Sequence, residues 1–373
     1  MKLIIEGYQY QEADVKHILQ GFEPYTRNRK TKIDHVGYLF SKEIGDCIFF
    51  LPKVLMNEKN EILFHEDLTP EKILDLDVAL QNEWVKKDDY EFLSQFSVWI
   101  FRAIREFYRL NPDSEILLSK SFSLLNSSED EKDATLLDII LSLIRFNNEN
   151  QDFFMFTIKN IHSGYNKINW NKTISHSAAV IQRKTPIYLD PVNKKKQINF
   201  DEELLVIFFS ILAHVNGKYG FRAPINYNYE LISEEMFENY LAGYGLIRLR
   251  QIKYKYFSDK ALRLWNLCHT FFEAAEKINS SAQDCDYLIA RNFNIVFESI
   301  IDELIGDDKT KIDASLKDQP DGKIVDHIFR YSSLINENDI YYIGDSKYYK
   351  IGGSLSGNSI YKQYTYAKNI IQF

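Results

Sequence analysis

Cysteine is scarce in this sequence: there are 3 in 373 residues, namely Cys47, Cys268 and Cys285. Residues so widely spaced make neither a zinc cluster nor a disulfide framework, so both are excluded. Long apolar runs are missing too, because no stretch approaches the ~18 uninterrupted apolar residues of a membrane-spanning helix. The first residues also lack the design of a cleavable signal. We therefore expect a cytoplasmic protein that makes no contact with a membrane.

Positive charge is in deficit as well, since the formal net charge is −8 at pH 7. The chain therefore has no global positive field to attract a polyanion, and any such contact needs local basic surface. Residues 27–32, residues 194–196, and Lys253 with Lys255 are candidates for such surface, although a solvated loop is the more ordinary interpretation of each. The phosphate-binding pattern GxxxxGK[ST] is absent, so the sequence carries no nucleotide-binding loop of this kind.

Apolar and aromatic side chains are abundant, at 45% and 14% of the residues. A chain of this length and content can bury more than one core, and about 150 residues per domain suggests two or three domains. We expect an α+β multidomain protein. Residues 1–66 form a small β-rich N-terminal module, and residues 67–255 a mainly helical middle region with a short β segment near 161–200. Residues 256–373 form a C-terminal α/β domain.

Local patterns set the expected elements of the first half. Residues 36–40 and 46–51 are strand-like runs with a turn at Gly45-Asp46 between them. From Thr69-Pro70, a cap followed by proline at the first helical position, the pattern turns helical and stays so to about residue 160.

Further along, residues 193–196 indicate a surface turn. A long helix begins near Asp201 and stops at Asn216-Gly217. His214 then lies at the helix end, and we interpret it as a helix-end residue and not as a ligand.

The most informative motif lies near the C-terminus, where an apolar, aromatic strand at 340–344 ends in Asp345-Ser346-Lys347. A strand repeats every two residues, so Asp345 and Lys347 point to the same face. The carboxylate can hold a hard divalent cation, which acts as a Lewis acid and lowers the pKa of a bound water. The ammonium can stabilise the transition state. Together they are the minimum equipment for phosphodiester hydrolysis, although a pattern this short also arises by chance.

A second carboxylate comes from the preceding strand. Residues 327–334 and 340–343 are typical of two strands joined by the polar turn at 336–339. In an antiparallel hairpin centred near residues 335 and 336, Asp326 lies opposite Asp345. Asp321 is the alternative, but it needs a hairpin centred at residue 333, and its Pro-Asp-Gly context is typical of a β-turn. We favour Asp326 and keep Asp321 open.

These residues resemble the PD-(D/E)xK nuclease superfamily. Residues 344–350 and 359–369 are similar in particular to the McrC-type and LlaJI-type restriction endonucleases, and the nuclease motifs cover roughly residues 290–373. A weaker likeness to the upstream part of LlaJI-type proteins runs through residues 35–38, 49–53 and 168–173. The two likenesses occur in the expected order.

The resemblance implies a C-terminal restriction-endonuclease-like core. It also implies a Mg²⁺- or Mn²⁺-dependent endonuclease that cuts double-stranded DNA in a restriction, or phage-defence, system. Asp326 and Asp345 would hold the metal and, with Lys347, would be catalytic. A helix before the hairpin often adds an acid in this superfamily, and Glu298 matches, with an ordinary glutamate on the polar face of the helix as the alternative. A later helix often adds a glutamine, and Gln363 matches.

The resemblance further implies a partner, because McrC-like proteins work with a separately encoded AAA+ protein. We therefore expect a McrB-like GTPase or ATPase subunit. The sequence stops at Phe373, where the nuclease fold usually continues with another strand, so we expect either a fold that closes differently or a truncated copy. The alternative function is a non-catalytic DNA-binding or assembly subunit that keeps the nuclease fold. Asp345 and Lys347 favour the enzyme, since a scaffold has no physical need for this pair on one strand face.

Overall fold

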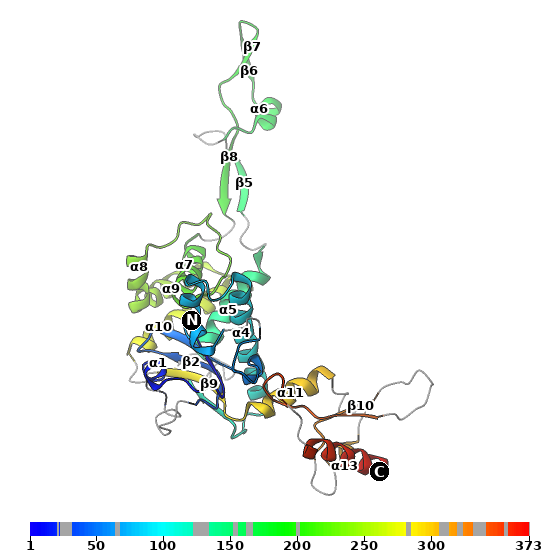
Figure 1. The fold of residues 1–373 in the computed structure, drawn as a ribbon. Helices are drawn as coiled ribbons and strands as arrows, with labels where there is room; N and C mark the ends of the chain where they lie inside the picture. The colour runs from blue at the N-terminus through cyan, green and yellow to red at the C-terminus, as the bar shows by residue number, and fades with distance from the viewer. Residues whose placement is uncertain are drawn as a thin grey trace. The chain divides into compact units, whose positions relative to one another are not determined.

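The computed structural model describes thirteen stretches of the chain: residues 1–20, 22, 32–63, 68–121, 134–151, 156–161, 167–198, 202–280, 285–305, 313–318, 324–330, 341–353 and 357–372. They form a mixed α+β protein, as expected (Figure 1). The chain divides into two compact units. Unit 1 comprises Met1–Leu136 with Ser281–Phe373, and unit 2 comprises Leu137–Ser280. The units do not follow the expected boundaries at residues 66 and 255, and the three-part division stays a prediction. None of the described helices is both long and apolar enough to span a membrane.

A five-stranded sheet organises the first unit. Its strand order is β1-β3-β2-β9-β4; β1 and β3 are parallel, and the other neighbours are antiparallel. The strands are β1 (Lys2–Ile5), β2 (Val36–Ser41), β3 (Asp46–Leu51), β4 (Leu117–Lys120) and β9 (Cys285–Ala290). The predicted strands at 36–40 and 46–51 are confirmed. β9 comes from the segment expected in the nuclease domain, yet it completes a sheet begun by the first residues of the chain.

Helices cover both faces of this sheet, which explains why β2 and β9 are buried along their whole length. The helix α4 (Lys87–Leu110) packs on one face, where the ring of its Phe101 lies 5.4 Å from that of Tyr38. On the other face, α1 (Glu12–Lys16) and the residues after it pack Phe22 against Phe50, with ring centroids 5.6 Å apart. Side chains that alternate along each strand thus enter two apolar layers.

Gly37 allows β2 and β9 to approach each other closely. Its φ is +147°, and a Cβ at this position would lie 2.3 Å from the carbonyl oxygen of Leu288. Only a residue without a side chain fits such a contact. The glycine therefore fixes the seam between the N-terminal strands and β9.

Short elements follow the sheet. The predicted helix start at Thr69-Pro70 is a 3₁₀-helix, η2 (Pro70–Ile73), and a second one, η1 (Lys53–Leu55), follows β3. The next helix, α3 (Leu76–Gln81), is capped by the Asp75 carboxylate, which accepts from the backbone N–H groups of Asp77 and Val78. The region expected to stay helical to about residue 160 is interrupted by β4 and by β5 (Phe156–Ile161), so that expectation was wrong there.

The C-terminal part of unit 1 is a small layered structure. It contains α11 (Phe293–Ile305), α12 (Ala314–Lys317), the antiparallel strands β10 (His327–Arg330) and β11 (Tyr341–Gly344), and α13 (Gly357–Gln372). Its apolar cluster joins the hairpin to α13: Val325 and Ile328 pack with Tyr366, and Ile343 and Ile370 lie against them. The predicted helices around Glu298 and Gln363 are confirmed as α11 and α13.

Unit 2 is mainly helical. Its helices are α5 (Leu136–Glu149), α7 (Glu202–Tyr219), α8 (Glu234–Asn239), the π-helix η5 (Tyr240–Tyr244), α9 (Gly245–Ile252), η6 (Lys253–Lys255) and α10 (Asp259–Ser280). The long helix expected from Asp201 is α7, but it does not stop at Asn216-Gly217. The Asn216 side chain instead bonds both backbone groups of Ala223. His214 thus lies within the helix, its ring 5.0 Å from that of Phe237.

The described β segment of unit 2 contains two antiparallel strand pairs. β5 pairs with β8 (Asn193–Ile198), and β6 (Ala179–Gln182) pairs with β7 (Thr185–Tyr188). Along the chain, the short helix α6 (Trp170–His176) lies between β5 and β6. The expectation of a surface turn at residues 193–196 was wrong, because these residues are in β8 and pair with residues 158–161.

Candidate active site at the end of the hairpin

The register of the C-terminal hairpin matches the prediction. His327 pairs with Gly344, Ile328 with Ile343, and Arg330 with Tyr341. Asp326 and Asp345 are one position beyond the His327–Gly344 pair, so the chain brings the two carboxyl groups together at the open end of the hairpin. Asp321, the alternative, lies outside the described residues.

Asp345 is the centre of the site. Its side chain is only 2% exposed, and its Oδ2 forms an ion pair with the Lys347 ammonium, two residues along on the same side of the chain. Burial opposes ionisation of Asp345, but polar contacts with Lys347, Asp326 and Gln363 outweigh it and hold the pKa of the carboxyl below its ordinary value. The Asp345 carboxylate is therefore charged at neutral pH.

Asp326 behaves in the opposite way. Burial, the hydrogen bond to Asp345 and the nearby charge of Glu298 raise the pKa of Asp326 to about 6. Two carboxylates this close resist ionising together, and here Asp326 keeps its proton more readily and donates it to Asp345. Glu298, from α11, is half-buried and contributes through its charge.

The helix α13 also contributes residues that contact Asp345. Gln363 contributes one of the polar contacts of Asp345. Its neighbour Lys362, which the sequence analysis did not select, places Nζ 4.0 Å from Oδ1 of Asp345 and 5.2 Å from the centre of the Tyr366 ring. Its position next to Gln363 in the motif was the signal that could have identified it.

The carboxylate pair fits a hard divalent cation. Oδ1 of Asp345 is buried and has no hydrogen-bond partner of good geometry within the described part of the chain. The pKa of Asp326 is raised by burial and by the neighbouring carboxylates, whose negative charge a cation would neutralise. No group of three or more His, Cys, Asp or Glu side chains among the described residues gathers closely enough to bind a metal. Two carboxylates suffice for Mg²⁺, which commonly takes its other ligands from water and substrate phosphate.

A second polar network lies behind the site, and the sequence analysis missed it. The imidazole of His327, 1% exposed, contacts the Ser346 hydroxyl through Nε2 and the Asp302 carboxylate through Nδ1, at 3.4 Å from Oδ1. Lys317 donates to Asp302 at 2.8 Å. Ser346 is the middle residue of the Asp-x-Lys motif, so this network fixes the motif from the side opposite the carboxylates.

Comparison with known proteins identifies the family. A family model described as "LlaJI restriction endonuclease" matches residues 83–373, well over half of the chain. The chain belongs to the LlaJI restriction endonuclease family. The matched residues include all five predicted site residues of this LlaJI-family chain.

Other comparisons add less. No curated protein sequence matches the chain. One solved structure that matches is titled a refined half-complex from a tetradecameric assembly of Thermococcus gammatolerans McrB AAA+ hexamers with bound McrC. The match covers 98% of this chain and 84% of that one at 11% identity, with a TM-score of 0.27. A score this low does not establish a shared fold.

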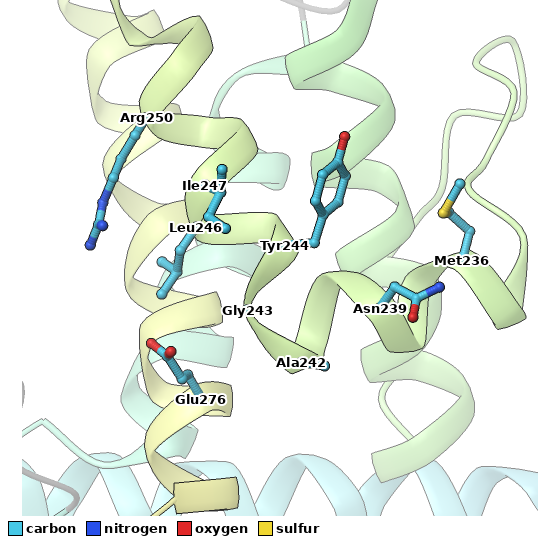
Figure 2. Close-up of a pocket in the computed structure, with 9 residues that line it drawn as sticks. All are labelled: Met236, Asn239, Ala242, Gly243, Tyr244, Leu246, Ile247, Arg250 and Glu276. Atoms are coloured by element: carbon cyan, nitrogen blue, oxygen red, sulfur yellow. The ribbon is translucent and has the colours of Figure 1, made fainter.

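A pocket in unit 2 has a different character from this site. It encloses about 690 Å³ and lies among α8, η5, α9 and α10, with Arg250 and Glu276 as its charged residues (Figure 2). Gly243 lines it with a φ of +116°. None of the predicted catalytic residues of the LlaJI-family chain lines this pocket.

Proposed function

We propose that this protein is the nuclease subunit of a restriction system and hydrolyses phosphodiester bonds of double-stranded DNA with Mg²⁺ or Mn²⁺. The observation that carries the proposal is the meeting of Asp326, Asp345 and Lys347 at one end of the hairpin. Membership of the LlaJI restriction endonuclease family supports it. The same three residues support a restriction-endonuclease-like core for the C-terminal segment.

Each residue has a role that its contacts suggest. Asp326 and Asp345 would hold the cation, which supplies Lewis acidity at the phosphoryl oxygen and lowers the pKa of a bound water. Lys347, 23% exposed and paired with Asp345, has its ammonium positioned to stabilise negative charge that develops on the scissile phosphate. Gln363 orients the Asp345 carboxylate, and Glu298 adds negative charge beside Asp326.

We also infer a separately encoded AAA+ partner of the McrB type. The support is in the sequence: the C-terminal motifs are similar to those of McrC-type proteins, and the GxxxxGK[ST] loop is absent. We expect the chain alone to hydrolyse no nucleotide and to cut DNA slowly or not at all. Nucleotide hydrolysis by the purified chain would contradict the inference of a separate AAA+ partner.

The test is a plasmid-cleavage assay on the protein purified with its partner from its own cell, with and without Mg²⁺, ATP and GTP. Lys347→Ala should lower the cleavage rate by about 10²–10³-fold, the cost of losing one group that stabilises transition-state charge. DNA binding and the thermal midpoint should hardly change. Lys16→Ala, which removes an exposed lysine of α1, is the matched control. If Lys347→Ala cuts as fast as the unaltered protein, the assignment of the active site to this end of the hairpin is wrong. A complex that binds DNA and never nicks it would favour the non-catalytic alternative.

A further inference from the structure

The segment after the hairpin has a second side that the proposed chemistry does not use. Asp345 and Lys347 pair with each other on one side, while Ser346 and Tyr348 make their contacts elsewhere. Consecutive side chains of an extended chain point to opposite sides, so Lys347 lies between two residues that face away from it. What fixes Ser346 and Tyr348 therefore fixes the backbone of Lys347.

Tyr348 is held by contacts with several other parts of unit 1. It is 7% exposed, and its ring lies 5.5 Å from that of Phe293 and 5.4 Å from that of Phe297, both on α11. Its hydroxyl donates to Glu6 and accepts from the backbone N–H of Lys53 at 3.2 Å. The Lys53 ammonium lies 4.6 Å from the centre of the ring.

Glu6 is a buried acid that takes no part in the carboxylate pair. It directly follows β1 and is 7% exposed. Its Oε2 accepts from Tyr348 and from the Lys53 N–H, the latter at 3.3 Å. Burial raises the pKa of Glu6 against these hydrogen bonds, and burial with the Glu6 charge raises the pKa of Tyr348. Tyr348 thus keeps its proton and remains the donor. A buried carboxyl is costly without such partners, so the pair has a definite geometry.

The attachment continues past Tyr348. The N–H of Ile351 donates to the carbonyl of Met56 at 3.0 Å, and Ile351 forms a parallel bridge with Asn57. Lys350 bonds the Asn60 side chain. The residues that follow Lys347 are therefore bound to residues 53–60, far from them in the sequence.

We propose that Glu6 and Tyr348 are positioning residues of the nuclease site: their hydrogen bond holds the backbone at Lys347 so that its ammonium stays beside Asp345. This inference rests on the proposed function. Glu6, the residue that follows the N-terminal strand, then contributes to the site without touching its reacting atoms. A displacement of about 1 Å at a catalytic group can cost on the order of 10²-fold in rate, so loss of one hydrogen bond here is measurable.

The variants are chosen to break the bond from both ends. Tyr348→Phe removes the donor and keeps the ring, Glu6→Ala removes the acceptor, and Glu6→Gln keeps an acceptor without the charge. Tyr8→Phe is the matched control, because the Tyr8 hydroxyl donates to a different acid, Glu71, in the same unit. The assays are single-turnover plasmid cleavage by the complex, Mn²⁺ titration of the chain by calorimetry, and hydrogen–deuterium exchange of residues 341–351.

We expect Tyr348→Phe and Glu6→Ala each to slow cleavage by about tenfold, since roughly 1.4 kcal/mol of lost positioning corresponds to that factor. DNA affinity and Mn²⁺ affinity should not change, so the effect falls on turnover. The double variant should be no slower than either single variant, because both break one bond. Glu6→Gln should retain most of the rate. The Ile351 amide should exchange faster in Tyr348→Phe and Glu6→Ala, and not in Tyr8→Phe.

Two outcomes would overturn the inference. If Tyr348→Phe and Glu6→Ala cut as fast as Tyr8→Phe, the bond does not position the site. If exchange at 341–351 is unchanged in both, it does not hold the segment, and this readout stands even when no DNA is cut. Absence of cleavage by the unaltered complex would instead count against the proposed function alone.

Discussion

The two sides of the segment 345–348 differ in how fully their polar groups are satisfied. On one side, Asp345 carries a buried oxygen without a good hydrogen-bond partner, and burial and neighbouring negative charge raise the pKa of Asp326. On the other side, Ser346 bonds His327 and Tyr348 bonds Glu6. The first arrangement is costly for a folded protein and useful for binding a cation and a phosphate. The second is what an ordinary buried polar group requires.

This difference separates stability from activity. Substitution of Asp326 should remove activity and leave stability equal or higher, because it relieves repulsion between like charges. Substitutions on the opposite side should lower both, since they leave a buried group without its partner.

The largest effect is expected for the carboxylate pair. Asp345→Asn and Asp326→Asn should each abolish cleavage and Mn²⁺ binding in calorimetry, because an amide is a poor ligand for a hard cation. The thermal midpoint of Asp326→Asn should not fall, whereas that of Asp345→Asn should fall slightly, because the Asp345 carboxylate loses its ion pair with Lys347. Asp321→Asn is the comparison that decides the second ligand: it should keep Mn²⁺ binding. If Asp321→Asn is the variant that loses the metal, Asp326 is an ordinary residue beside the hairpin.

A smaller effect is expected behind the motif. Ser346→Ala removes the bond to His327 and should cost about 0.5–1.5 kcal/mol of unfolding free energy in a denaturant titration. It should slow cleavage by about tenfold through displacement of Asp345 and Lys347, with Mn²⁺ affinity unchanged. Ser210→Ala is the control, since Ser210 bonds Val206 and Ile232 in unit 2. Ser210→Ala should lose as much stability as Ser346→Ala and keep full activity. Full activity in Ser346→Ala would show that the two sides are independent.

The smallest effect is expected for Lys362, which is 44% exposed and 4.0 Å from Asp345. A long pair with one exposed partner contributes about 0.2–1 kcal/mol, so Lys362→Ala should slow cleavage by at most about fivefold. Lys368→Ala, an exposed lysine on the same helix, controls for lost charge. A loss as large as that of Lys347→Ala would make Lys362 a principal phosphate contact.

The sequence was informative where local rules decide the structure. A hairpin has one register for a given turn centre, so the position of Asp326 opposite Asp345 followed from the strand limits alone. The polar partners of this site were harder to predict, because His327 and Asp302 meet through tertiary packing that no local spacing in the sequence reveals. Gln363 was selected from resemblance, and Lys362 beside it was passed over.

Sequence reasoning failed where contacts with residues outside the local segment decide its structure. Residues 193–196 are rich in lysine and look like a solvated turn, yet they form a strand because β5 pairs with them. Asn216-Gly217 has the composition of a helix stop, but Asn216 finds its partner at Ala223 and the helix continues to Tyr219. The place of β9 between β2 and β4 is a pairing of the same long-range kind.

That position of β9 also sets an order in time. A ribosome that has made β4 must add the chain from residue 120 to residue 285 before the strand between β2 and β4 exists. At roughly 5–20 residues per second this takes roughly 8–33 s, during which the facing edges of β2 and β4 have no strand to pair with. The hairpin with Asp326 and Asp345 follows only then. The nascent chain therefore forms the candidate site only after it has made all five strands of the sheet next to which Glu6 binds Tyr348.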